Sequence, residues 1–542
     1  MPRSKRQRPR LMFAVAMGSG FLLHSHLAHA DDYTDLLDIL RAKGSLTQTE
    51  YDGLLAKHLH HAHPVTPRTR TAAARRGSAA ETTARIQPGE SRRPYAPPPP
   101  DSLSLLAQAQ DAAARAQASA QDARQALLST RSAMNSDSVV RVAKYVPGKG
   151  ITIKAGQIDI NFSGFVNGFY TFNSPGGGTP VAGGVSTGAS GFDTSSVRNG
   201  LLPAGLLVKL STTQDGLDLS ANFGFYPGLD NNNPGAFNAN SGGSAVGLGT
   251  AGLDVRQVFA TVGNKDIGTF KVGRDLGLFG GDAILNDATL LSVGSTGSNA
   301  NPANTSLGRI GVGYVYADWI PQISYASPVY HGLQGTIGIF QPLDEFNFAG
   351  SGYSATNVQH SSPMVQGKVT YDFDVGSLKG RIWSSFLVEH QQHLLGAAIA
   401  SQSSRSTTAV AGDIGTKLTY GRLEGVAYYY YGSGLGTTGL FFDGLSQSGR
   451  KRDSEGYYVQ AAYKIFPRLK VVGSYGVSNL YQAPGESIPL MVRRNESEVG
   501  AAYFTLTDWL TLMAEYAHTR SAAHGPDHNS DNTVSAGAAI FF

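Results

Sequence analysis

The sequence predicts an all-β protein, a transmembrane antiparallel β-barrel of about sixteen strands (sixteen to eighteen), preceded by a short α-helical periplasmic extension. Three observations predict this fold. From residue 151 to the C-terminus, apolar and polar side chains alternate in segments of about ten residues, as strands with two different faces require. The joints between these segments are alternately short and long, as in barrels with short periplasmic turns and long external loops. The 24 tyrosines and 24 phenylalanines gather at segment ends, where aromatic rings suit the membrane interface.

The composition excludes several classes of function. The chain has 66 glycines among 542 residues and no cysteine, so it has no disulfide, no thiolate metal site and no cysteine nucleophile. The net charge of +4 depends on residues 1–10, which carry five basic side chains and no acid. Without this segment the chain is close to neutral, whereas a nucleic-acid-binding protein keeps a basic surface. We therefore expect no nucleic-acid partner.

Residues 1–30 predict a secretory signal peptide. A basic start precedes an apolar run over residues 11–23, and the segment closes on Ala28-His29-Ala30. The small side chains of Ala28 and Ala30 suit signal peptidase, so we expect cleavage after Ala30. The apolar run is too short to span a bilayer, and the rest of the chain has no longer apolar stretch. The chain is therefore expected to be exported, and a barrel places it in an outer membrane.

Three segments separate the signal peptide from the barrel. Residues 31–60 predict two short helices, and the Pro- and Arg-rich residues 61–100 predict a disordered linker. Residues 101–145 are rich in Ala and Gln and predict a helix, either a short coiled coil or a single solvated helix. Four histidines between residues 58 and 63 lack a second shell to orient them, so no metal site is expected there.

The barrel segment, residues 151–542, begins with a clear alternation. Ile158, Ile160 and Phe162 share one face, and Asp159 and Asn161 share the other. The same period recurs over residues 365–372, 457–464 and 510–519, and the chain ends on a strand that carries an aromatic residue at position 542. The pattern gives sixteen strands, or seventeen if residues 309–318 form a full one, and closure favours an even number. Small polar inward faces predict a wet lumen, and therefore passage through it.

One part of the barrel carries a more specific pattern. Several short motifs follow one another over residues 250–345, and their order and spacing together are more specific than any one of them. They are the strand beginning at Arg256, Asp266-Ile267-Gly268-Thr269-Phe270, Gly273-Arg274, Gly308-Arg309 and Tyr325-Ala326-Ser327-Pro328. With these motifs and its terminal Phe542, the chain resembles the general porins of Gram-negative bacteria, which are trimeric sixteen-stranded diffusion channels. The resemblance implies an outer-membrane homotrimer in contact with lipid. It also implies passive passage of small hydrophilic solutes and ions, without a cofactor.

The resemblance further implies a charged constriction. In that family the third external loop folds into the lumen and sets carboxylates opposite arginines of the barrel wall. Arg256 and Arg309 match the wall arginines, and Asp282 and Asp287 are the expected loop acids. Such an arrangement screens solutes by size and charge.

The chain also departs from the family pattern. Lys209 replaces a second wall arginine, and Leu291 stands where a second acid is expected. Arg274 is a further candidate for the constriction, although alternation with Phe270 and Val272 points it towards lipid unless Gly273 carries a bulge.

Other functions stay open. The chain has no G-x-S-x-G, H-E-x-x-H or phosphate-loop pattern, so we do not expect an enzyme. The alternatives to a diffusion channel are a porin selective for sugars or anions and a structural tether or adhesin with a blocked lumen. Residues 31–145 are interpreted either as a contact to peptidoglycan or to the other subunits of a trimer, or as a passive spacer.

Overall fold

The computed structural model describes residues 102–134, 140–229, 253–295, 305–357, 359–399 and 405–542. The chain divides into two compact units, residues 1–101 and 102–542. The first unit lies outside the described residues. The predicted signal peptide, the two short helices and the linker all fall within it, so they stay predictions.

A long helix, α3 (Ser102–Met134), begins the described part of the chain. Alanine and glutamine dominate it, and both favour the helix by propensity. The predicted helix is confirmed over Ser102–Met134, but its predicted extension to residue 145 is wrong, because Val140–Val142 form a strand. The side chains of residues 111–130 are all exposed, and the choice between a coiled coil and a solvated helix stays open. Within the described ranges, no helix has both the length and the apolar character needed to cross a membrane.

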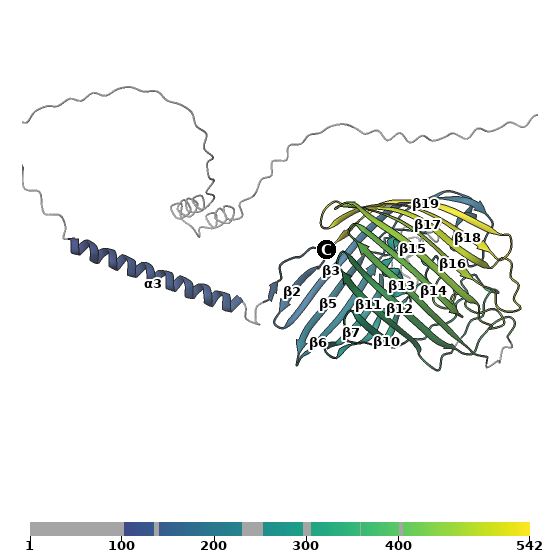
Figure 1. Ribbon diagram of the computed structural model, residues 1–542, viewed down its shortest axis with the longest axis horizontal. Coiled ribbons are helices and arrows are strands. Elements are labelled where there is room, and N and C mark those ends of the chain that lie inside the picture. Colours follow the sequence, from purple (N-terminus) through teal and green to yellow (C-terminus); the bar gives the residue numbers. More distant parts are fainter. Residues whose placement is uncertain (1–101, 135–139, 230–252, 296–304, 358, 400–404) are drawn as a thin grey trace, which may run out of the picture. The chain divides into compact units, whose positions relative to one another are not determined.

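Sixteen antiparallel strands close into a barrel, as the sequence predicts. Each strand pairs with the next, and the last pairs with the first, so that the strands run side by side around the barrel (Figure 1). The strands are β3 (Ile158–Gly178), β5 (Gly205–Gln214), β6 (Leu217–Pro227), β7 (Leu253–Asn264), β8 (Gly268–Leu276), β9 (Trp319–Ala326), β10 (Leu333–Phe340), β11 (Met364–Val375), β12 (Leu378–Gln391), β13 (Thr407–Tyr420), β14 (Leu423–Ser433), β15 (Asp453–Phe466), β16 (Leu469–Leu480), β17 (Val492–Thr505), β18 (Leu510–Ala523) and β19 (His528–Phe541).

Three short strands lie near β3 in addition to its two barrel neighbours, β5 and β19. The strands β1 (Val140–Val142) and β2 (Ile151–Ala155) pair with each other, and β2 pairs with the start of β3. Further along, β4 (Thr194–Arg198) pairs with β3 beyond the part that pairs with β5. The alternative of seventeen barrel strands is wrong, because residues 309–318 form only isolated bridges inside the barrel.

The strands have two different faces, as the alternation predicts. In β14, Tyr428 and Tyr430 are buried inside the barrel, whereas Tyr429 and Tyr431 are 41% and 46% exposed on its outside. Because lipid surrounds the outer face of a transmembrane barrel, the exposed apolar side chains suit a membrane. The four consecutive tyrosines therefore point alternately into the barrel and towards its outer surface.

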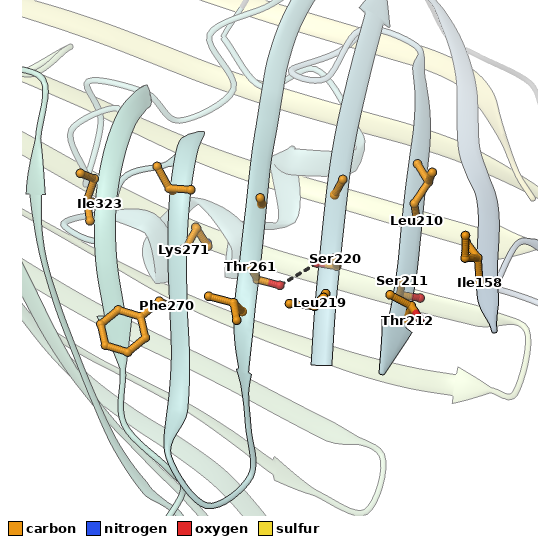
Figure 2. Close-up of a pocket in the computed structure, with 14 residues that line it drawn as sticks. Ile158, Leu210, Ser211, Thr212, Leu219, Ser220, Thr261, Phe270, Lys271 and Ile323 are labelled. Atoms are coloured by element: carbon orange, nitrogen blue, oxygen red, sulfur yellow. Dashed lines mark hydrogen bonds between the residues drawn. The ribbon is translucent and has the colours of Figure 1, made fainter. Parts of the chain in front are cut away.

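The outer face also carries an apolar hollow of about 460 Å³. Its labelled side chains come from neighbouring strands, from Ile158 on β3 to Ile323 on β9 (Figure 2). The hydroxyl groups of Ser220 and Thr261 lie 2.6 Å apart and hydrogen-bond between β6 and β7 (Figure 2). Since Ile323 and Phe270 are more than half exposed on the outside of the barrel, this hollow belongs to the membrane-facing surface.

The C-terminal residue completes the seam between β19 and β3. The Gly164 N–H donates to the Phe542 carbonyl at 3.1 Å, and the Phe542 N–H donates to the Gly164 carbonyl at 3.0 Å. The Phe542 ring lies over Gly164, where a Cβ atom would approach the ring to 2.8 Å and the Gly205 carbonyl oxygen to 2.4 Å. The ring also packs against Trp509, with 6.0 Å between centroids. The seam therefore requires a residue without a side chain at position 164.

We predict that Gly164→Val impairs folding of the barrel. The added side chain must displace the Phe542 ring and a paired strand, and overpacking of this kind costs roughly 1–3 kcal/mol. The measurement is the fraction that refolds into detergent micelles, read from the heat-dependent shift in gel mobility. The matched control is Gly473→Val, because a Cβ atom added at Gly473 on β16 would meet no other atom within 4 Å. Equal refolding of the two variants would contradict the role given to Gly164.

Candidate functional site

A long segment folds into the barrel between β8 and β9. The described residues of this segment, 277–295 and 305–318, are called the lumen loop and contain a short helix, α4 (Gly281–Asn286), and a 3-10 turn, η2 (Ala288–Leu291). Its side chains form one apolar cluster with inward-facing wall residues of β12, β14 and β15. Fully or almost fully buried members of the cluster include Phe279, Val312, Tyr314, Trp383, Tyr428 and Tyr458. The lumen loop is therefore packed against the inner wall.

Polar wall side chains hold the backbone of the lumen loop. Five of them accept hydrogen bonds from its N–H groups: Gln366 on β11, Asp413 on β13, Gln460 on β15, Ser478 on β16 and Glu515 on β18. Gln366 accepts two, from Leu278 at 2.8 Å and from Phe279 at 2.9 Å. Because an unpaired backbone group is costly once it is buried, these side chains allow an irregular segment to lie inside the barrel.

Asp282, one of the two predicted loop acids, contacts cations of the barrel wall. Its carboxylate is 2.6 Å from the Lys368 ammonium on β11 and 3.5 Å from the Arg381 guanidinium on β12. Arg381 also pairs with Asp372 at 2.7 Å. The structure thus brings a loop acid to basic wall residues, but these are not the arginines that the sequence predicts.

Asp287 and Arg309 lie together, with 3.7 Å between Oδ1 and Nε, and both side chains are fully buried. Asp287 also accepts hydrogen bonds from the Thr289 N–H at 3.0 Å and the Tyr314 hydroxyl at 2.9 Å. The predicted wall position of Arg309 is wrong, because Arg309 belongs to the lumen loop and not to a barrel strand. The pair therefore joins two parts of one loop and does not span an open gap.

Arg256 is turned towards the lumen by a β-bulge. The register between β6 and β7 shifts from Gly224–Gln257 to Phe225–Val255, which leaves Arg256 as the extra residue. Its guanidinium carbon lies 5.3 Å from the centroid of the Tyr226 ring, and its Nε is 2.5 Å from the Asp254 carboxylate. Simple alternation from the exposed Val258 would have pointed Arg256 outwards, so the bulge decides its direction.

The last two candidates have different positions. Arg274 pairs in register with Val258 and Pro321, and no register shift occurs at Gly273. Arg274 therefore shares the outer face of β8 with Val272, and its assignment to the constriction is wrong. Lys209 is exposed on the inward face of β5, with Asn161 and Asn222 as its register partners.

Sequence reasoning missed the wall residues that hold the loop. Alternation over residues 365–372 already gives Gln366 and Lys368 the same face, but no local signal connects them to a loop almost ninety positions earlier. In the part of the chain that the structure describes, no group of three or more His, Asp or Glu side chains is arranged to hold a metal ion.

The long loops at the same end of the strands as the lumen loop form a polar network around Arg452. This fully buried side chain pairs with Glu486 at 2.6 Å and donates to the Ser354 hydroxyl at 2.8 Å and the Asp443 carbonyl at 3.0 Å. These contacts join three loops. Burial raises the pKa of the neighbouring Glu345 well above its usual 4.5, and the carboxylates of Glu389 and Asp443 raise it further.

Comparison with known proteins identifies the class of fold. No family model matches the chain, and no curated protein matches it in sequence. Among solved structures, the outer membrane channel DcaP of Acinetobacter baumannii is similar, with a TM-score of 0.54 and 16% identity over 71% of this chain and 97% of that chain. Also similar is OmpF of Salmonella typhi in complex with daunomycin, with a TM-score of 0.45 and 11% identity over 74% of this chain and 100% of that one.

An anion-selective porin from Comamonas acidovorans is similar as well, with a TM-score of 0.43 and 12% identity over 71% of this chain and 100% of that chain. The likeness to DcaP, together with the closed sixteen-stranded barrel, shows that this chain has the fold of the Gram-negative outer-membrane porins. The fold implied by the sequence resemblance is thereby confirmed.

We predict that Gln366→Ala loosens the lumen loop. The substitution leaves the N–H groups of Leu278 and Phe279 without their acceptor, at a cost of roughly 1–3 kcal/mol for each buried group. The expected result is a larger and noisier single-channel current in a planar bilayer. The matched control is Gln334→Ala, because Gln334 donates to the Ser327 carbonyl in a turn and makes no hydrogen bond to the lumen loop in the described structure. Unchanged current in Gln366→Ala would refute this role.

The pKa of Glu345 predicts a dependence of stability on pH. Because its raised pKa means that the Glu345 carboxyl binds a proton more tightly in the folded than in the unfolded state, the free energy of unfolding should increase as the pH falls towards 4.5, the pKa of an unfolded glutamate. The melting temperature should therefore rise between about pH 8 and about pH 6, and the rise should be smaller in Glu345→Gln, which carries no titrating group there. Melting curves followed by circular dichroism provide the test, and identical slopes in both proteins would contradict it.

Proposed function

We propose that this chain forms a water-filled channel in the outer membrane of a Gram-negative bacterium, through which small hydrophilic solutes and ions diffuse passively. The observation that carries this proposal is the lumen loop, which five wall side chains hold inside a sixteen-stranded barrel. A barrel of this size is wide enough for water, and a loop inside it narrows the path. The exposed, inward-facing Lys209 and its polar neighbours suit a hydrated path along the inner wall.

We further propose that the channel prefers anions. Four inward-facing acids have a basic partner within 4.0 Å and so contribute little net field: Asp159, Asp372, Asp374 and Glu424. By contrast, three inward-facing lysines have no acidic partner at this distance among the described residues: Lys209, Lys464 and Lys470. Asp218 is an exposed inward-facing acid without a described ion pair. Asp413, Glu515 and Asp531 also face inwards without a described ion pair, but they are buried, whereas Lys209 and Lys464 are exposed. The exposed, unpaired lysines attract anions and repel cations.

The proposed anion preference predicts a change of selectivity in Lys209→Glu. Replacing a cation by an anion at an exposed position on the lumen wall should shift the reversal potential in a salt gradient towards cations, with a several-fold change in the permeability ratio. The control is Lys265→Glu, which makes the same change in charge in a turn outside the lumen, where the Lys265 side chain is 90% exposed. Equal shifts in the two variants would show that Lys209 does not face the ion path.

The channel itself is tested by the conductance of the refolded mature protein in a planar bilayer. We expect stepwise openings, and groups of three steps for a homotrimer. Correctly folded barrels that never conduct would overturn the proposal and favour a structural tether or adhesin with a blocked lumen.

A further inference from the structure

An apolar hollow of about 250 Å³ lies inside the barrel, between the lumen loop and the wall strands β3 to β9. On the wall side, Phe165, Leu207 and Trp319 line it, and on the loop side Leu285 and Leu290 do. This composition is unusual for a path that carries hydrophilic solutes, since apolar surface in contact with water is unfavourable. The hollow is separate from the ion pairs of Asp282 and Asp287, because none of their residues lines it.

The hollow is open to the lumen. Leu285 is 58% exposed, although its neighbour Ile284 on α4 is only 6% exposed and belongs to the apolar cluster behind the loop. When an apolar ligand covers an exposed leucine beside other apolar side chains, the free energy falls in proportion to the apolar area removed from water. The position of Leu285 therefore favours a ligand over further packing of the protein itself.

The polar edge of the hollow restricts the ligand's polar group. Arg256 is among the lining residues, and its guanidinium provides hydrogen-bond donors only, so a ligand group that reaches it must offer an acceptor. Asp254 lies 2.5 Å from Arg256 and already balances its charge. A neutral acceptor such as a carbonyl oxygen suits this edge, because an added negative charge would have to compete with the Asp254 carboxylate.

Size and shape restrict the rest of the ligand. A cavity of about 150 Å³ lined by aliphatic and aromatic side chains is known to hold benzene, so the present hollow has room for one ring and a small substituent. Aromatic side chains stand on the wall side, where Tyr226 lies 6.4 Å from Phe165 and 6.1 Å from Trp319 between ring centroids. Such rings favour offset or edge contacts with another aromatic ring.

We propose that this hollow is a binding subsite of the channel for neutral solutes that consist of one aromatic ring and a carbonyl group. The inference rests on the proposed channel function, which it extends to a class of solute. The ring lies against Leu207, Leu285 and Trp319, and the carbonyl oxygen accepts a hydrogen bond from Arg256. A solute that lodges there slows the ion current without sealing the path permanently.

The test compares benzamide with acetamide, which has the same amide group and no ring. Benzamide added to a conducting channel in a planar bilayer should reduce the current saturably, whereas acetamide at the same concentration should not. In Leu285→Ala the half-blocking concentration of benzamide should rise roughly fivefold, because the ring loses apolar contact area. The matched control is Leu395→Ala, a 41% exposed leucine outside the lining of the hollow, which should leave the block unchanged.

Equal effects of benzamide and acetamide, or equal blocks in the wild type and Leu285→Ala, would overturn the subsite. A second readout separates this failure from failure of the channel. The chain has three tryptophans, and in a variant with Trp383→Phe and Trp509→Phe the fluorescence reports Trp319 alone. Benzamide should change this fluorescence in detergent-solubilised protein even if no current flows. A conducting channel whose Trp319 signal does not respond would refute the subsite and leave the channel function standing.

Discussion

The structure depends on one constraint, which is that the backbone of a membrane-spanning sheet finds no hydrogen-bond partners in lipid. Closure of the barrel satisfies this constraint, and it is completed where β19 meets β3 and Phe542 pairs with Gly164. Every other feature follows from a closed wall: an outer face that contacts lipid, an inner face that contacts water, and an interior into which a loop can fold.

The same constraint explains how the lumen loop is held. An irregular segment inside the barrel has backbone groups that no strand pairs, and wall residues such as Gln366 and Glu515 supply the acceptors. Charged groups at the loop are mostly engaged in close pairs, as Asp282 with Lys368 and Asp287 with Arg309. Their main role is therefore to position the loop. Lys209 among the cations and Leu285 among the apolar residues are exposed, and these are the groups to which the proposals assign contact with ions and solutes.

The combination of an apolar hollow and nearby cations gives this lumen two kinds of surface. In the proposed channel, the unpaired lysines would act on ions at a distance, because their field extends into a water-filled path. Leu285 and Trp319 would act only on a solute that touches them, because apolar contact has no range beyond the contact itself. The proposed passage and the proposed binding thus depend on different residues.

The sequence by itself determined the barrel, a strand number close to sixteen, its terminal aromatic residue and a helix before the barrel, because period-two alternation, joint lengths and helix propensity are local properties of the chain. It also identified Asp282 and Asp287 as residues of an inward loop. Only the tertiary structure decided their partners, because Lys368 and Arg381 come from distant strands. It also decided the direction of Arg256, which a single-residue bulge reverses, and the place of Arg309, which depends on whether its segment joins the sheet or packs inside it. Alternation fixes a side chain's face only while the pairing register is regular, and the register depends on the neighbouring strand.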